Sequence, residues 1–397
     1  MESETHMSED KKVNILHLCP DEKFIDRALD TFESAFPGQN KVCAYTKKKP
    51  AKYIKHNIEY SACAIDVMCG VSKKYVEGFD VVILHSLNSA WYRTIERLST
   101  NVPIVWIGWG YDYYDIIDPL NNTLLSKTKK FEEDRRNKKG EKKGIKQRIQ
   151  GFLNRKNRVI RLIERINYFS PVIDTEYDIL KNVGSWRCFP TLARWNYAAA
   201  EYDLSTYVKD VKALNIAKEN ILVGNSATST NNHLEAFDLL NSIGFKNREI
   251  IVPLSYGDLS YGAELVNIGA TLLGDSFSPL IDFMSPVEYI DKINQCGFVI
   301  MNHVRQQAVG NIIIMLYLGA KVFLREENPT YKFFKNEGVV LFTIQELSKN
   351  HAHLKFSLTD EEVKLNRSIL DAIWSNKALV KKTHILMEQV VNKREQL

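Results

Sequence analysis

The stretch Ile221–His233, ILVGNSATSTNNH, decides the fold of the second half of the chain, because an apolar run stops at a glycine and gives way to hydroxyl and amide residues. We interpret it as a buried strand, a short loop and the start of a helix. Its small polar residues can cap the helix, and Gly224 lets a ligand approach backbone N–H groups. Such a loop at a helix N-terminus suits a phosphate. The alternative is an ordinary capped turn, which the stretch alone favours because it is neither a Walker A motif nor G-x-G-x-x-G.

The same alternation of apolar strands and helices continues downstream of this stretch. It indicates a second βα array, and short apolar runs and helical spacing define its elements. We expect strands at Glu249–Leu254, Thr271–Leu273, Gly297–Met301 and Lys321–Leu324, and helices at Asn232–Ser242, Gly262–Gly269, Pro286–Gln295, Ile312–Leu318 and Asp360 to about Val391.

The first half of the chain shows the same pattern. Strands are expected at Val13–Leu18, Val81–Leu84, Val102–Ile107 and Tyr168–Val172. Strands and helices alternating at this spacing predict a parallel sheet covered on both faces, so the fold class is α/β. In such sheets ligands bind at the carboxyl ends of the strands. His85, Asn88 and the segment Trp109–Asp115 follow strands in this way.

Length and composition favour two domains. The 397 residues are 45% hydrophobic and 25% charged, which is enough apolar material for more than one core. We expect a first domain over residues 12–195, a second over 215–360, and a C-terminal helix over 361–397, with packing back toward the first domain as one option. The six cysteines show no C-x-x-C or paired Cys/His spacing, so we expect free thiols and no zinc site.

The positive charge of the chain is concentrated in residues 123–166. This segment holds nine Lys and seven Arg against five Asp and Glu, a net of +11, whereas the whole chain carries +5. Apolar residues recur at roughly helical spacing from Ile145 to Ile166, which is typical of a basic amphipathic helix on an anionic membrane surface. The alternative is a solvated loop followed by a core helix. No nucleic-acid motif accompanies the charge, so we expect no nucleic-acid partner.

Neither a signal peptide nor an apolar run of spanning length is visible in the sequence. We therefore expect a peripheral protein at the cytoplasmic face of the inner membrane, with residues 1–11 as a disordered lead.

Five ordered motifs in the second half resemble one family. They are the ILVGNS stretch with Asn232 and His233, then Val252–Gly257 (VPLSYG), Arg305–Gly310 (RQQAVG), Glu327–Pro329 (ENP) and Val340–Thr343 (VLFT). In this order they resemble the bacterial transferases that move 4-acetamido-4,6-dideoxygalactose (Fuc4NAc) from a TDP-sugar onto a lipid-linked disaccharide in enterobacterial common antigen assembly. His85-x-x-Asn88, Trp109-Gly110-x-Asp112 and Phe189–Thr191 match in the first half, so the resemblance covers most of residues 80–345.

The resemblance implies a GT-B architecture. In this fold two Rossmann-like domains face each other across a cleft, the second holds the nucleotide sugar, the acceptor enters from the first, and no metal is obligatory. No separate cofactor is expected. The sequence agrees about the metal, because Asp112-Tyr-Tyr-Asp115 lacks the spacing of a D-x-D carboxylate pair.

Arg305 is the predicted cation for the donor diphosphate. Its guanidinium can hold two phosphate oxygens and can stabilise the leaving nucleoside diphosphate. The alternative is a surface arginine in a loop. The remaining residues predicted to bind donor sugar or phosphate lie in the same two loops: Gly224, Asn225, Ser226, Gln306, Gln307, Gly310 and Asn311.

Glu327 and Tyr256 are predicted to contact the nucleoside. The Glu327 carboxylate can accept hydrogen bonds from ribose hydroxyls, with the neighbouring Asn328 in the same site, although a carboxylate near a helix start is also favoured by the helix dipole. Tyr256 can stack on the pyrimidine or lie over the sugar, and a simple rim tyrosine is the competing interpretation. His233 and His303 are further candidates for phosphate contact.

Asp112 is the predicted general base if the reaction inverts, because a carboxylate at a strand end of the first domain faces the incoming hydroxyl. His85 is the rival. A lone histidine at a strand end is more often a hydrogen-bonded structural group.

The sequence therefore predicts a glycosyltransferase that moves a deoxyamino sugar from a TDP-linked donor to a polyprenyl-diphosphate-linked saccharide. Two alternatives stay open. One is a sugar-nucleotide epimerase of the same architecture, and the other is a non-catalytic protein that binds membranes or nucleic acid through the basic segment.

Overall fold

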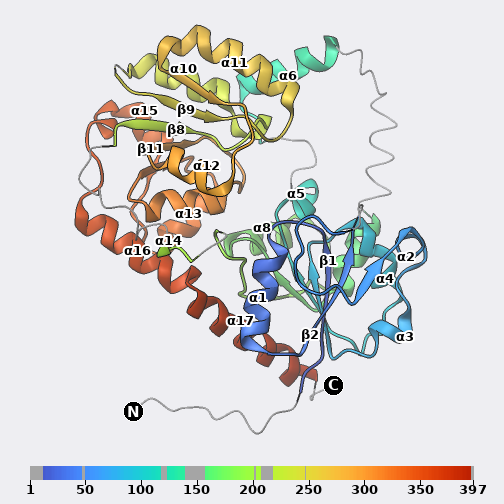
Figure 1. Ribbon diagram of the computed structural model, residues 1–397. Coiled ribbons are helices and arrows are strands. Elements are labelled where there is room, and N and C mark those ends of the chain that lie inside the picture. Colours follow the sequence, from blue (N-terminus) through green and yellow to red (C-terminus); the bar gives the residue numbers. More distant parts are fainter. Residues whose placement is uncertain are drawn as a thin grey trace.

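The computed structural model describes residues 12–46, 50–117, 123–138, 157–200, 203–206, 218–245 and 247–394. These residues form two domains, each built on one parallel β-sheet with helices around it (Figure 1). The α/β fold class is therefore confirmed.

The sheet of the first domain has seven strands in the order β3-β2-β1-β4-β5-β6-β7. Its central strands are continuous apolar runs, as parallel strands buried on both faces require. The strands are β1 (Ile15–Pro20), β2 (Asn40–Tyr45), β3 (Tyr60–Ala62), β4 (Val81–His85), β5 (Ile104–Ile107), β6 (Tyr168–Ser170) and β7 (Thr191–Leu192).

Helices connect these strands. The named helices of this half are α1 (Ile25–Ala35), α2 (Ala64–Cys69), α3 (Lys73–Val76), η1 (Ser89–Trp91), α4 (Tyr92–Arg97), α5 (Tyr111–Ile117) and α8 (Thr175–Val183). Both α5 and α8 begin shortly after the carboxyl ends of β5 and β6, so their first turns lie at the ligand edge of the sheet.

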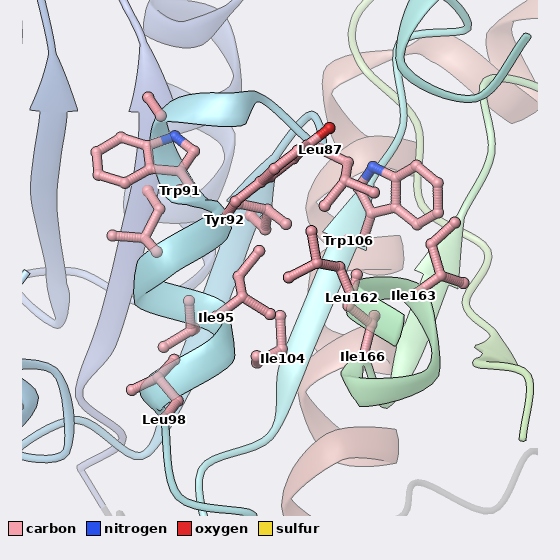
Figure 2. Packing of buried hydrophobic residues seen from close by; sticks show 14 of the residues in the cluster. Leu87, Trp91, Tyr92, Ile95, Leu98, Ile104, Trp106, Leu162, Ile163 and Ile166 are labelled. Carbon is pink, nitrogen blue, oxygen red and sulfur yellow. The ribbon is translucent and has the colours of Figure 1, made fainter. Parts of the chain in front are cut away.

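A helix over residues 157–165 covers one face of this sheet. Leu162, Ile163 and Ile166 are buried and pack toward Ile104 and Trp106 of β5 (Figure 2). The end of the basic segment therefore places these apolar residues in the protein core. The residues that would extend the predicted amphipathic pattern, Ile145, Ile149, Phe152 and Leu153, lie outside the described residues.

The sheet of the second domain has six strands in the order β10-β9-β8-β11-β12-β13. Strand β8, which contains the apolar run before Gly224, lies between β9 and β11. The strands are β8 (Asn220–Val223), β9 (Ile250–Pro253), β10 (Phe277–Leu280), β11 (Cys296–Met301), β12 (Lys321–Leu324) and β13 (Phe342–Thr343).

The helices of the second domain follow these strands. They are η2 (Ser229–Asn231), α10 (His233–Ile243), α11 (Leu259–Leu273), η3 (Gly274–Ser276), α12 (Pro286–Ile293), α13 (Val309–Tyr317), α14 (Pro329–Asn336), α15 (Ile344–Lys349) and η4 (His351–Leu354).

The strand predicted at Thr271–Leu273 is wrong. These residues form the last turn of α11, which starts earlier than predicted because the Asp258 side chain caps the backbone N–H groups of Ser260 and Tyr261. Three residues are too few to distinguish a strand from the end of a helix by periodicity. The strand of this unit is β10, which begins four residues after Leu273.

The C-terminal helix predicted from Asp360 is two helices, α16 (Asp360–Trp374) and α17 (Asn376–Arg394). Ser375 between them has extended backbone angles. Figure 1 shows α17 lying beside α1 of the first domain. The indole N–H of Trp195 donates to Thr383 Oγ1 at 2.8 Å, and Leu386 is buried in the same core cluster as Phe32. The C-terminus therefore returns from the second domain to the first.

Helix α6 (Ser126–Lys138) packs against α10 of the second domain, although the nearest named elements before and after it in the described sequence, α5 and β6, belong to the first. The backbone N–H of Thr128 donates to Glu235 at 2.9 Å. Arg135 is 6% exposed and is bonded to Glu132, Asp258 and Glu264. This part of the basic segment is therefore docked on the second domain.

Candidate functional site

The loop after β8 is folded around Asn231. Asn231 Oδ1 accepts hydrogen bonds from the backbone N–H of Asn225 at 3.0 Å and from His303 Nε2 at 2.7 Å. Its amide group donates to the carbonyl oxygens of Ser226 and Thr228, both at 3.0 Å. The loop between β8 and α10 is therefore fixed by one buried side chain before any ligand binds.

Gly224 is required by this arrangement. Its φ is +68°, and a Cβ placed on it would lie 2.8 Å from both Asn231 Oδ1 and His233 Nε2. Two polar atoms thus converge on the space that a side chain would fill. His233 is also the first residue of α10, an eleven-residue helix whose N-terminus carries partial positive charge.

His233 and His303 are both fully buried, and burial lowers the pKa of each to about 3, so both rings are neutral. His233 Nε2 and His303 Nδ1 have no hydrogen-bond partner among the described residues. A buried polar atom without a hydrogen-bond partner costs free energy, which a ligand group bonded to it would recover. The structure thus places both predicted histidines at the loop after β8.

Arg305 is half-buried in the loop after β11, and its guanidinium lies over the ring of Tyr114, 4.9 Å from the ring centroid. Its Nε atom is buried and has no partner in the described part of the chain. Asn328 holds this loop, because its amide donates to the carbonyl oxygens of His303 at 2.8 Å and Arg305 at 2.9 Å. Asn328 Oδ1 caps α14 through the N–H of Thr330, so its side chain shapes the loop.

Other predicted donor residues are engaged within the protein. Gln307 connects the two loops, since it donates to Asn225 Oδ1 at 3.0 Å and accepts from Thr230 at 2.6 Å. The buried hydroxyl of Ser226 lies 2.9 Å from Thr228 Oγ1. Asn225 and Gln307 are half-buried, so these two side chains keep some access to solvent.

Of the residues that follow Arg305, Gln306 and Gly310 contact residues outside the second domain, whereas Asn311 bonds within it. The backbone N–H of Gln306 donates to Tyr114 OH at 3.0 Å, and Gln306 Oε1 occupies the position that a Cβ on Gly110 would approach to 2.6 Å. Gly310 packs against the carbonyl oxygen of Ala199, where a Cβ would come within 2.6 Å. Asn311 donates to Tyr289 OH at 3.1 Å. Sequence reasoning assigned these residues to the donor and did not foresee the contacts.

Glu327 forms a polar group with two residues that the sequence did not single out. Its carboxylate accepts from Arg325 Nε at 2.5 Å and from Gln345 at 2.9 Å. Partial burial raises the pKa of Glu327, but the hydrogen bonds and the Arg325 charge outweigh it, and the net pKa is lowered. Tyr256 lies at the end of β9 and is 76% exposed, as a stacking residue at the rim would be.

Asp112 joins the ends of two strands in the first domain. Its Oδ2 accepts from the N–H of Leu87 and from Trp106 Nε1, both at 2.8 Å, and its Oδ1 accepts from the N–H of Trp109 at 2.9 Å. Burial raises the pKa of this carboxyl group even though the three donors oppose the change. The side chain lies at the carboxyl edge of the sheet, as predicted, and much of its hydrogen-bonding capacity is used by groups of the protein itself.

His85 has both ring nitrogens occupied. Tyr197 OH donates to His85 Nδ1 at 2.7 Å, and His85 Nε2 donates to His17 Nδ1 at 3.0 Å. His17 Nε2 in turn donates to Asn40 Oδ1 at 3.1 Å. Burial, followed by the nearby His17, lowers the pKa of His85 well below its ordinary value. His85 is fully buried and therefore offers no free nitrogen to a substrate.

An aromatic group lines the same edge of the first sheet. The Trp109 ring makes edge contacts with Phe24, Tyr111 and Tyr197, with centroids about 6 Å apart. Phe24 is 45% exposed and Tyr111 is 52% exposed. Sequence reasoning noted Trp109 but missed Phe24, because that residue comes from the start of α1.

Glu176 is the second residue of α8 and was also missed. It is fully buried, accepts a hydrogen bond from Tyr113 OH at 2.6 Å, and has an unpartnered Oε1 within the described structure. Burial raises the pKa of Glu176 to about 7, against the lowering effects of Tyr113, Tyr114 and Arg305. A carboxyl group with a raised pKa is a candidate functional group, and only the folded structure reveals it.

The described residues contain no group of three or more His, Cys, Asp or Glu side chains that could hold a metal ion. None of the helices in the described ranges combines the length and apolar character needed to cross a membrane.

Comparison with known proteins supports the resemblance seen in the motifs. Residues 190–361 match the family described as 4-alpha-L-fucosyltransferase, glycosyl transferase group 56. This range contains the loops after β8, β9, β11 and β12.

The fold over nearly the whole chain is similar to solved structures. Sucrose-phosphate synthase from Thermosynechococcus elongatus is 12% identical, with 96% of this chain and 100% of that chain covered and a TM-score of 0.61. A glycosyltransferase from Rickettsia africae is 12% identical, with coverage of 96% and 99% and a TM-score of 0.58. HepE from Anabaena in complex with UDP-glucose is 11% identical, with coverage of 97% and 100% and a TM-score of 0.54. At these identities the likeness concerns the GT-B fold.

Proposed function

We propose that this GT-B glycosyltransferase, whose residues 190–361 match the 4-alpha-L-fucosyltransferase family, transfers a Fuc4NAc-like deoxyamino sugar from a TDP-linked donor to a polyprenyl-diphosphate-linked saccharide in surface polysaccharide synthesis. The observation that carries the proposal is the polar space between Gly224 and His233 Nε2 at the carboxyl edge of the second sheet. Arg305 belongs to the neighbouring loop after β11, which hydrogen bonds from His303 and Gln307 join to the loop after β8.

The donor diphosphate binds in this polar space. The absent side chain at Gly224 and the N-terminus of α10 favour an anion, and His233 Nε2 is a polar atom that a phosphate oxygen can satisfy. Arg305 provides a charge-assisted fork for the phosphates. It also stabilises the charge that develops on the leaving TDP, so the reaction is proposed to need no metal.

The nucleoside lies toward β9 and β12. Glu327, held in place by Arg325 and Gln345, accepts a hydrogen bond from a sugar hydroxyl of the nucleoside. The exposed ring of Tyr256 stacks on the base or covers the donor sugar. The remaining predicted donor residues, including Ser226, Gln307 and Asn328, act mainly by shaping the two loops.

The acceptor saccharide binds the first domain. Phe24, Trp109 and Tyr111 offer apolar ring faces to the C–H faces of a sugar. Asp112 lies beside them in sequence and space and remains the proposed base, since its Oδ1 accepts one hydrogen bond and keeps a second lone pair. His85 is not proposed as the base, because both of its nitrogens are occupied.

The protein is proposed to act at the cytoplasmic face of the inner membrane. The basic segment supplies cations for anionic lipids, each contributing roughly 1 kcal/mol near the surface. Because Ile163 and Ile166 are core residues, the described end of this segment is expected to contribute charge, without inserting apolar side chains into the lipid.

The test is a transfer assay with TDP-Fuc4NAc and a lipid-linked disaccharide, in which released TDP and glycosylated lipid are measured together. Wild type should form glycosylated lipid and release TDP in equal amounts. Arg305→Ala should lower kcat/KM about 10²–10³-fold, whereas Arg93→Ala, which removes an exposed arginine on α4, should match wild type. Full activity of Arg305→Ala would contradict the donor site.

A further inference from the structure

Glu176 lies where the two domains meet. Its neighbour Thr175 donates from Oγ1 to the carbonyl oxygen of Pro329 at 3.1 Å, which joins the start of α8 to the start of α14. Asn328, directly before Pro329, holds the carbonyl oxygen of Arg305. The first turn of α8 is therefore connected to the loop that carries the proposed donor cation.

The burial of Glu176 is only partly compensated, because burial raises its pKa although the Tyr113 and Tyr114 side chains lower it by hydrogen bonding. One oxygen accepts from Tyr113 OH, and that hydroxyl oxygen itself accepts from the N–H of Val172 at 3.2 Å. The other oxygen has no partner in the parts of the chain that the structure describes. Removing a carboxylate from water costs free energy when its oxygens lack hydrogen-bond partners. A core residue selected for stability alone would therefore not be a glutamate.

Tyr114 connects Glu176 to the second domain. Its ring stacks with Tyr113 at a centroid distance of 5.6 Å, its hydroxyl accepts from Gln306 N–H, and its face carries the Arg305 guanidinium. The Arg305 charge lowers the pKa of Glu176, and the Glu176 charge raises the pKa of Tyr114, so the three groups lie within electrostatic reach of one another. Within the described residues Arg305 Nε is buried and has no partner, as is also the case for the Nε atoms of Arg27 and Arg165.

We propose that Glu176 is a positioning residue that acts through Tyr114 to hold the Arg305 guanidinium across the domain boundary, ready for the donor diphosphate. The proposal rests on the donor site described above. It means that the first domain takes part in donor binding although it contributes no direct donor contact, and that donor binding is linked to the contact between the domains.

A proton change follows from this arrangement. A bound diphosphate brings negative charge toward Glu176 and takes over the Arg305 cation, and both effects raise the pKa of Glu176. The groups that face Glu176 are Tyr113 and Tyr114, whose raised pKa values keep them neutral, and the Arg305 guanidinium. Donor binding is therefore accompanied by proton uptake, and donor affinity decreases as the pH rises through 7.

The experiment is calorimetric titration with TDP-glucose at pH 6, 7 and 8 in buffers of different ionisation enthalpy. A nucleotide sugar is the suitable probe, because its phosphates lack the terminal ionisation near pH 6 that complicates TDP. Wild type should take up a fraction of a proton and bind several-fold more weakly at pH 8 than at pH 6. Glu176→Gln keeps the acceptor for Tyr113 and should bind with no proton uptake and no pH dependence.

The matched control is Asp178→Asn, an exposed carboxyl group on the same helix, which should behave like wild type. The same proton uptake in Glu176→Gln and wild type would overturn the proposal. Tyr114→Phe keeps the ring but removes the acceptor for Gln306, and it should weaken TDP-glucose binding several-fold; wild-type affinity in this variant would also contradict the proposal.

Failure of the donor site itself would be recognised separately. If no nucleotide sugar binds wild type, the proposed function is wrong, while the link between Glu176 and Arg305 can still be measured in the ligand-free protein. There the raised pKa of Glu176 favours folding below about pH 4.5 and costs stability as the pH rises through 7. Glu176→Gln should thus raise Tm at pH 8 relative to wild type but not at pH 4. In an Arg305→Ala background this difference in Tm at pH 8 should be larger. An unchanged difference would contradict the link between Glu176 and Arg305.

Discussion

A Cβ on Gly224 would lie 2.8 Å from His233 Nε2, so the glycine and the histidine together define a small polar space at the start of α10. Gly224→Ala places a methyl group in that space and strains a backbone with φ of +68°. We expect donor affinity to fall at least tenfold, measured by calorimetry with TDP-glucose.

Gly244→Ala is the matched control for this substitution. Gly244 ends the same helix with φ of +77°, but nothing lies within 4 Å of its Cβ position. It should cost about 1 kcal/mol of stability and leave donor affinity unchanged. Equal loss of affinity in both variants would show that strain, and not the space beside His233, is responsible.

Asn328 is expected to matter for donor binding through the Arg305 loop. Asn328→Ala removes its bonds to the carbonyl oxygens of His303 and Arg305 at a fully buried position. The free energy of unfolding should fall by about 3 kcal/mol in a urea titration, since buried carbonyl groups lose their donors. The KM for the donor should rise in the fraction that stays folded.

Asn350→Ala provides the comparison. Asn350 is an exposed cap of η4 that accepts from the N–H of Ala352. Loss of this cap should lower the free energy of unfolding by about 1 kcal/mol and leave the KM for the donor as in wild type. An Asn328→Ala protein with unchanged KM would mean that the Arg305 loop does not need this support.

Asp112 and His85 can be distinguished by substitution. If Asp112 is the base, Asp112→Asn should lower kcat for transfer about 10²-fold or more in the folded protein. The substitution should also lower the stability of the protein, because the new amide N–H would face one of the three backbone or indole N–H donors. His85→Gln should lower Tm, because the His17 and Tyr197 bonds are disturbed, with kcat near that of wild type. Wild-type kcat in Asp112→Asn would remove it as the base.

The sequence predicted the strands with long apolar runs and the loops that follow them. Strands β8, β11 and β12 were recognisable because parallel strands buried on both faces need continuous apolar residues. Gly224 and Arg305 could be singled out because their residue types suit phosphate and lie just after such strands. The end of α11 was misread, because Thr271–Leu273 carries too little pattern to separate helix from strand.

The remaining features depend on contacts between distant residues. The local sequence around Glu176 does not show that this residue becomes fully buried beside Tyr113. The local sequence around Arg135 does not show that α6 docks on the second domain. The tertiary context also reassigns predicted residues. Gln306 and Gly310 have the small or polar character of ligand contacts, yet they pack against Tyr114 and Ala199.

The most direct test of the donor site is titration with TDP, followed through Tm by thermal unfolding. TDP at 100 times its dissociation constant should stabilise wild type by roughly 2.7 kcal/mol, with UDP and GDP giving smaller shifts at the same concentration. The stabilisation should disappear in Arg305→Ala and persist in Arg93→Ala. No shift with any of the three nucleotides, or an equal shift in Arg305→Ala and wild type, would contradict a diphosphate site formed by Gly224, His233 and Arg305.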